Sequence, residues 1–321
     1  MARRRCQTPA SVAPGEREFL LPAGSGEAEV AERLARRLTL DAGAADVEER
    51  VLLDSVDGRL GAAGLHAHWT AGALVLVEEG APPRRAEVAA AGRYLVAEIP
   101  PGPVRERLAG VLKERALLPL ARVTLASRPL AVRNDDAKTV ARLAVERVTV
   151  TVERGRRVPL APRLRLKAVR GYDRAFERVE KAVVETLQPD VPERPVFDEA
   201  VEAAGGQPGG VSSKPRIQLE PGAPAGHAAL LVLTRLADIA EANVAGTLDD
   251  LDTEFLHDLR VSIRRARSVL RELKGVFPPA ALARVRAELR WAQAVTGQTL
   301  YVDGGANLES FARDFVHMMR N

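Results

Sequence analysis

The sequence predicts an α+β fold: an antiparallel β tunnel or barrel with flanking helices, followed after a linker by a partial all-α helical bundle. Three observations predict it. Residues 16–152 carry short, β-type apolar runs separated by turn residues. Residues 189–226 hold seven prolines and six glycines, a density typical of a linker. Beyond them the apolar residues recur at helical spacing.

Composition sets the class of the chain. With 321 residues and 46% hydrophobic residues, it is long enough for two globular domains. The formal net charge of +4 matters only where the charge is clustered. The single cysteine, Cys6, excludes a disulfide framework. No apolar run reaches the roughly 18–20 residues of a membrane span, so a cytoplasmic protein with no membrane partner is expected.

The first domain is expected at residues 16–187, after a disordered N-terminus at residues 1–15. Turn signals such as Asp57-Gly58 favour hairpins between its strands. Helices are expected at residues 28–38, 104–116 and 173–187. Strands are expected around the apolar runs at residues 19–21, 51–53, 74–77, 94–96, 123–125 and 148–150.

The second domain is expected at residues 227–297, after a linker at residues 188–226. Helices are predicted at residues 227–245, 253–276 and 279–295, with breaks at Gly246, Gly275 and Gly297. Residues 298–321 form an atypical C-terminal tail. The first domain is therefore mixed and the second all-helical.

The middle helix of the second domain carries two parallel stripes. The apolar residues step by three and four and predict a buried seam; they are Leu256, Leu259, Ile263, Ala266, Leu270 and Leu273. The basic residues take the same steps one position later, about 100° round the helix; they are His257, Arg260, Arg264, Arg267, Arg271 and Lys274. Arg265 is expected to add to them, and Arg286 and Arg290 on the next helix to face the same groove.

Regularly spaced guanidinium groups suit successive phosphates of an anionic polymer. The alternative is a solvated helix face, although such faces usually mix charge signs. His257 is more often a packed histidine than a ligand, and when protonated it could donate to phosphate. A nucleic-acid binder shares the electrostatics, but aromatic residues make up only 4% of the chain and do not lie along the basic helix, so nucleic acid is the less favoured partner.

The segment 252–295, with its core Glu254-Phe255-Leu256-His257-Asp258-Leu259-Arg260-Val261, resembles the opening of a CHAD domain, a conserved-histidine α-helical domain. The resemblance implies a helical bundle that binds inorganic polyphosphate and an association with polyphosphate granules. The matching positions are occupied by His257, Arg260, Arg264, Arg265 and Arg267, and the further expected contacts are Arg271, Lys274 and Arg290.

The region 16–187 resembles the CYTH family, the triphosphate-tunnel fold. The resemblance rests on residues 16–19, 54–60 with 63–65, and 134–138. The resemblance implies that Glu16 and Glu18 stand where active members hold a divalent metal, Mg²⁺ or Mn²⁺. No other cofactor is implied.

Leu20 stands where that pattern has a phosphate-binding lysine, and His66, His68 and Trp69 replace expected basic residues. These departures predict a degenerate tunnel without catalysis, which binds anions only weakly. The expected lining cations are Arg122, Arg128, Arg133, Lys138 and Arg142. The alternative is a metal-dependent triphosphatase acting on inorganic triphosphate or a nucleotide.

The C-terminal tail departs from the CHAD pattern. Residues 296–305 resemble the last strand of short-chain dehydrogenases, without that family's nucleotide loop. The expectation is a junction near Gly297 that leaves about three helices of the bundle. An uncovered apolar seam would then favour self-association.

Overall fold

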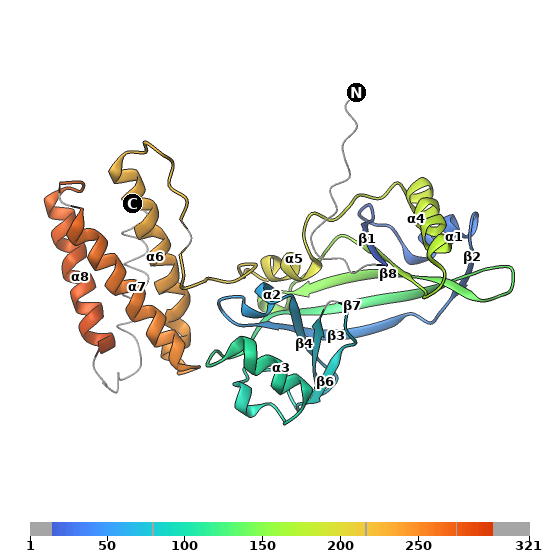
Figure 1. Ribbon diagram of the computed structural model, residues 1–321, viewed down its shortest axis with the longest axis horizontal. Helices are drawn as coiled ribbons and strands as arrows, with labels where there is room; N and C mark the ends of the chain where they lie inside the picture. The colour runs from blue at the N-terminus through green and yellow to red at the C-terminus, as the bar shows by residue number, and fades with distance from the viewer. Residues whose placement is uncertain (1–14, 79, 216, 274, 298–321) are drawn as a thin grey trace.

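The computed structural model describes residues 15–78, 80–215, 217–273 and 275–297 (Figure 1). A large antiparallel sheet with helices on its faces forms the N-terminal domain, and three long helices lie side by side at the other end of the molecule. The predicted α+β class is confirmed.

The sheet has ten strands, and eight of them follow the order β1-β10-β8-β7-β3-β4-β5-β6, every pair antiparallel. β2 and β9 join it on β7 and β8. The strands are β1 Glu16–Leu20, β2 Thr39–Ala42, β3 Asp46–Asp54, β4 Leu65–Thr70, β5 Ala73–Glu78, β6 Arg84–Glu87, β7 Leu118–Arg133, β8 Thr139–Thr151, β9 Arg157–Pro159 and β10 Arg163–Ala168.

Helices cover the sheet on separate apolar clusters. α1 (Glu27–Ala35) and α4 (Asp173–Leu187) pack on β7, β8 and β10. α3 (Pro103–Leu112) and the short α2 (Arg59–Ala62) pack on β3, β4 and β5. Two 3₁₀ turns, η1 (Val96–Glu98) and η2 (Glu153–Gly155), lie in the same domain. No helix in the described part of the chain is long and apolar enough to cross a membrane.

The sheet curls without closing. β1 and β6 are its two edges, and no ladder among the described residues joins them. The range predicted as linker contributes here, because it contains α5 (Val196–Ala203), whose Ala200 and Val201 are buried. Ala200 packs with strand residues of β3, β7 and β8, so α5 belongs to the N-terminal domain rather than to a flexible linker.

Two other sequence expectations for the N-terminal domain were wrong. Residues 94–96 form no strand: Tyr94 makes one isolated bridge to Leu117, and η1 begins at Val96. The second helix ends at Leu112 instead of residue 116, because Lys113 takes a positive φ of 55°. The chain after α3 is therefore free to turn toward the C-terminal helices.

The C-terminal domain consists of α6 (Ala225–Leu248), α7 (Thr253–Glu272) and α8 (Pro279–Gly297) around one apolar cluster. Leu259, Ile263, Ala266 and Leu270 of the predicted seam are buried. At its N-terminal end the seam begins at Phe255, which is 2% exposed, whereas the predicted Leu256 is 37% exposed.

Gly246 is not the helix break that the sequence predicted. It lies inside α6, where a Cβ atom would come within 2.3 Å of the Phe255 ring. The glycine therefore allows α6 and α7 to approach closely. The resemblance of residues 298–305 to a dehydrogenase tail lies outside the described residues.

Candidate functional site

The basic helix α7 begins at a side-chain cap. Asp252 Oδ1 accepts hydrogen bonds from the backbone nitrogens of Glu254 at 2.9 Å and Phe255 at 3.1 Å. An aspartate at this position satisfies backbone donors that otherwise lack partners. The cap fixes where the helix starts and thereby which side chains share a face.

Most of the predicted basic stripe lies on one exposed flank of α7. His257, Arg260, Arg264 and Arg271 are exposed, and Arg267 is half-buried. Arg271 pairs with Glu272 at 2.8 Å. The side chains of Arg260, Arg264 and Arg267 make no hydrogen bond or ion pair with any residue that the structure describes. Three guanidinium groups on one helix flank are thus available to an anion.

Other members of the predicted set are placed differently. Arg265 lies about 100° round the helix from Arg264 and donates to the carbonyl of Ser213 at 2.8 Å, so it faces the interdomain segment. Arg286 donates to the carbonyl of Leu270 at 2.6 Å and holds the end of α7. Arg290 on α8 is exposed, and Lys274 lies outside the described residues.

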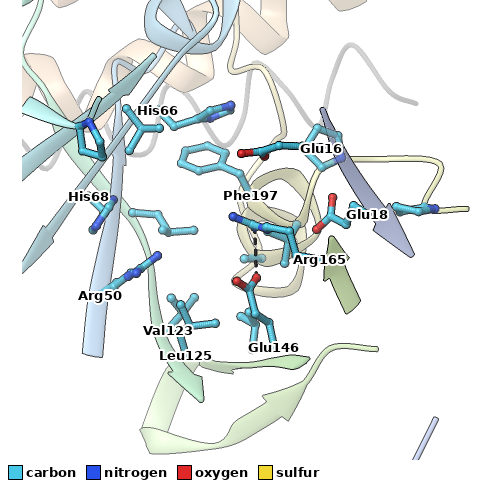
Figure 2. Close-up of a pocket in the computed structure, with 18 of the residues that line it drawn as sticks. Glu16, Glu18, Arg50, His66, His68, Val123, Leu125, Glu146, Arg165 and Phe197 are labelled. Atoms are coloured by element: carbon cyan, nitrogen blue, oxygen red, sulfur yellow. Dashed lines mark ion pairs between the residues drawn. The ribbon is translucent and has the colours of Figure 1, made fainter. Parts of the chain in front are cut away.

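A pocket of about 410 Å³ lies inside the curled sheet of the N-terminal domain (Figure 2). Its walls come from β1, β3, β4, β5, β7, β8 and β10, and residues 192–197 with Ala200 close one side. Leu52, Val123, Leu125 and Val148 give it an apolar part. The pocket therefore combines an apolar surface with several charged side chains, as small-ligand pockets do.

The charges around this pocket compensate one another. Figure 2 shows Arg165 reaching toward the middle, where it pairs with Glu146. Alternate residues of β10 all pair with carboxylates: Lys167 with Glu16 at 2.7 Å, Arg165 with Glu146 at 3.1 Å, and Arg163 with Glu18 at 3.1 Å and Glu199 at 2.8 Å. No excess of positive charge remains to hold a triphosphate.

The two predicted metal ligands are held in ion pairs. Glu16 and Glu18 lie on one wall of the pocket, as predicted, but both carboxylates are engaged by basic side chains of β10. Within the described residues, no group of three histidine, cysteine, aspartate or glutamate side chains could hold a metal ion. Mg²⁺ usually takes one or two carboxylates together with waters and substrate phosphates, so binding here would require Glu16 and Glu18 to leave Lys167 and Arg163.

The two predicted histidines also line the pocket. Burial, together with the nearby charge of Arg50, lowers the pKa of His68 to about 4. The ring of His66 lies 5.4 Å from that of Phe197, and its Nδ1 atom is buried without a hydrogen-bond partner. His68 is accordingly neutral at pH 7 and adds no positive charge to the pocket.

The other predicted tunnel cations do not reach the pocket. Arg133 is at the far end of the β7–β8 hairpin, where it pairs with Asp41 at 2.6 Å, and Lys138 in the same hairpin is 65% exposed at its side chain. Arg122, Arg128 and Arg142 are likewise absent from the lining.

Sequence reasoning placed Glu16, Glu18, His66 and His68 at this pocket but missed several other lining residues. Among the missed residues are Arg50, Glu146, Arg165, Lys167 and Phe197. The alternation of basic and apolar residues in segment 163–167 was the available signal, since residues two apart in a strand share a face.

The two domains meet around one buried arginine. Arg115, 1% exposed, follows α3 and reaches the start of α7. Its guanidinium group contacts Asp258, lies 3.4 Å from Asp252 Oδ1, and stacks 4.8 Å from the centre of the Phe255 ring. Asn243 Oδ1 of α6 accepts from the same group at 3.5 Å. One side chain of the N-terminal domain thus contacts α6 and α7 together.

Residues 54–60, on which the tunnel resemblance partly rests, lie on the N-terminal side of this junction. Asp54 accepts from the backbone nitrogens of Leu60 at 2.8 Å and Gly61 at 3.0 Å, and burial raises its pKa. Asp57 lies 2.9 Å from Arg59 Nε and 3.7 Å from Arg115 Nε. The motif 54–60 therefore serves the domain junction in this chain.

Comparison with family models matches residues 231–300 to the CHAD domain, in agreement with the sequence resemblance. Among solved structures, a Bacillus halodurans protein provisionally assigned as an adenylate cyclase aligns at 13% identity and a TM-score of 0.37, over 58% of this chain and 96% of its own. A Hippeastrum protein, provisionally an adenylyl cyclase and described with a dominant triphosphatase activity, aligns at 12% and 0.37, over 60% and 95%. Scores this low carry no argument. Curated proteins show no significant match.

Proposed function

We propose that this protein binds inorganic polyphosphate through the exposed flank of α7. The observation that carries the proposal is the row of guanidinium groups of Arg260, Arg264 and Arg267, which have no partner among the described residues. From Arg260 to Arg271 the flank extends about 16 Å, at roughly 1.5 Å per residue. A chain of several phosphates spans this length, and a single small anion does not.

The chemistry of the flank favours phosphate over nucleic acid. Arginine binds phosphate oxygens through a planar fork of donors. Proteins that bind single-stranded nucleic acids add aromatic side chains on which bases stack. Phe255, the one aromatic residue of α7, is buried against α6 and Arg115. The CHAD resemblance of this segment supports the same ligand.

The N-terminal pocket is proposed to take no catalytic part. Glu16 and Glu18 hold basic side chains, and the alternation of charge along β10 is matched by carboxylates. A triphosphate would have to break several of these ion pairs to enter. The alternative, a metal-dependent triphosphatase, requires that Glu16 and Glu18 be released from Lys167 and Arg163.

Replacing Arg264 and Arg267 together by Gln tests the proposal. We expect affinity for long-chain polyphosphate to fall at least about tenfold at low salt, because each phosphate contact contributes counterion release, roughly 0.7 in the slope of log affinity against log salt for single-stranded polyanions. Titration at several salt concentrations should show a flatter slope. Helicity should persist, since Gln is a good helix former.

A matched control removes the same charge elsewhere. Arg142 on β8 and Arg284 on α8 are exposed and have no partner among the described residues. The double variant Arg142→Gln/Arg284→Gln should bind almost as the unchanged protein does. Equal losses in the two double variants would mean that net charge, rather than the α7 flank, determines binding.

A further inference from the structure

We infer that Arg115 of the N-terminal domain is a positioning residue of the polyphosphate site: it fixes the first turns of α7 and counters the carboxylates there. The inference rests on the proposed function, since it concerns the same helix. In this role the N-terminal domain positions the helix that binds polyphosphate.

The contacts of Arg115 determine where α7 begins. Asp252 caps the helix through Oδ1, and its Oδ2 accepts from the backbone nitrogen of Ala116, next to Arg115, at 2.8 Å. Asp258, in the second turn of α7, contacts the guanidinium group of Arg115 directly. Both ends of the first turns of α7 are thereby tied to the connection between α3 and β7, so the direction of the exposed flank is set by the N-terminal domain.

The same contacts affect the charge that a polyanion meets. Asp252, Glu254 and Asp258 lie at the start of α7, beside His257 and Arg260. Unpaired, these carboxylates would repel phosphate within the Debye length of about 10 Å at 0.1 M salt. Arg115 pairs with Asp252 and Asp258, and Arg59 lies 3.7 Å from Glu254. Among the described residues, the arginines that form ion pairs with these carboxylates, Arg59 and Arg115, both belong to the N-terminal domain.

An arginine is suited to this place. Its planar group offers donors in several directions and stacks on an aromatic ring, as it does here with Phe255. A buried charge left without its partner is strongly unfavourable, whereas removing both partners of a buried pair is often tolerated. This asymmetry allows the role of Arg115 to be separated from its effect on folding.

The test uses the full chain and long-chain polyphosphate, with affinity measured from low to high salt. For Arg115→Met we expect a loss of about tenfold at low salt, which shrinks as salt screens the uncovered carboxylates. Arg115→Met/Asp258→Asn should recover most of that loss, because the unpaired carboxylate is then gone. Arg93→Met is the matched control: Arg93 donates to the carbonyl of Leu251, between α6 and α7, at 2.9 Å and pairs with Glu98 at 3.4 Å, but it pairs with no carboxylate of α7 or of its cap.

The outcomes separate the two proposals. Failure of the unchanged protein to bind polyphosphate overturns the proposed function itself. Binding by the unchanged protein with an unaltered Arg115→Met affinity at every salt overturns only the inference. A loss that is independent of salt and not recovered in the double variant, with helicity intact, also overturns it, because Arg115 would then act without any effect of charge on the site.

Discussion

Arginine serves two opposite purposes in this molecule, and burial decides which. Arg115 and Arg163, 1% and 2% exposed, are each surrounded by acceptors from separate segments and join them. Arg260 and Arg264 have neither burial nor a described partner. A buried guanidinium group must be paired, while an exposed unpaired one remains available for a ligand.

His68 should make the stability of the protein depend on pH. Its pKa is lowered to about 4, mainly by burial, so the folded protein disfavours its protonated form. The contribution of the neutral side chain is present above the ordinary pKa near 6.5 and is lost as pH falls toward 4, by up to about 3 kcal/mol.

The measurement compares the unchanged protein with His68→Gln, which cannot titrate. Urea unfolding at pH 7 and at pH 4.5 should show a larger decrease in unfolding free energy for the unchanged protein. Carboxylates titrate in both proteins and largely cancel in the difference. Parallel pH dependences would show that His68 is not buried in its neutral form.

Gly246 should be intolerant of any side chain. A Cβ atom there would lie 2.3 Å from the Phe255 ring, so Gly246→Ala forces α6 and α7 apart. We expect a loss of about 1–3 kcal/mol in unfolding free energy, typical of overpacking. Gly226→Ala in the same helix is the control, because its Cβ meets nothing closer than 3.6 Å. Equal stability of the two variants would contradict the close helix contact.

At the scale of elements, periodicity predicted the helices well and the sheet only in part. α4 was predicted with its observed bounds, and α6, α7 and α8 within a few residues, because each carries a long apolar stripe. β10 was missed because its alternate residues are charged and face inward, contrary to the usual pattern. Only the partner carboxylates on β1, β8 and α5 make such a strand acceptable, and sequence spacing does not reveal them.

The candidate site shows the same division. The exposed flank of α7 followed from spacing within one helix, which needs no tertiary information. Arg265 was misplaced because the interdomain segment, which receives its hydrogen bond, packs on the other flank. Arg133 and Lys138 were expected in the pocket, but they lie in a hairpin whose length the turn residues alone did not fix.

The segment between α4 and α6, residues 188–224, should resist proteolysis where Arg163 holds α5. That guanidinium group lies 2.8 Å from Glu199 and donates to the carbonyl of Arg194 at 3.2 Å. Proteolysis needs a locally opened backbone. With a nonspecific protease, we expect the first cuts after residue 203 and before residue 225, as mapped by mass spectrometry.

Removing the contacts of Arg163 with α5 should change the cleavage sites. In Arg163→Met the first cuts should move into residues 190–203, while Arg178→Met, on the exposed side of α4, should keep the original sites. Cleavage of the unchanged protein within α5 itself would contradict the packing of Ala200 and Val201.

At the scale of the whole molecule, positive charge is placed unevenly rather than in excess. The formal charge is only +4, and the pocket of the N-terminal domain is compensated by its own carboxylates. The described cations without partners include three on one flank of α7. Under the function that we propose, a polyanion binds to this cluster on α7 and not to the compensated pocket.

This placement predicts that chain length, and not phosphate content, determines binding. Tripolyphosphate reaches only a short part of the flank, whereas a long chain engages successive arginines, each contact raising the effective concentration for the next. In displacement of labelled long-chain polyphosphate, tripolyphosphate should need at least about tenfold more total phosphate than an unlabelled long chain. It should also release no phosphate with Mg²⁺ or Mn²⁺, because Glu16 and Glu18 remain paired with Lys167 and Arg163. Phosphate release that disappears in Glu16→Gln/Glu18→Gln would instead place triphosphate, and catalysis, in the tunnel pocket.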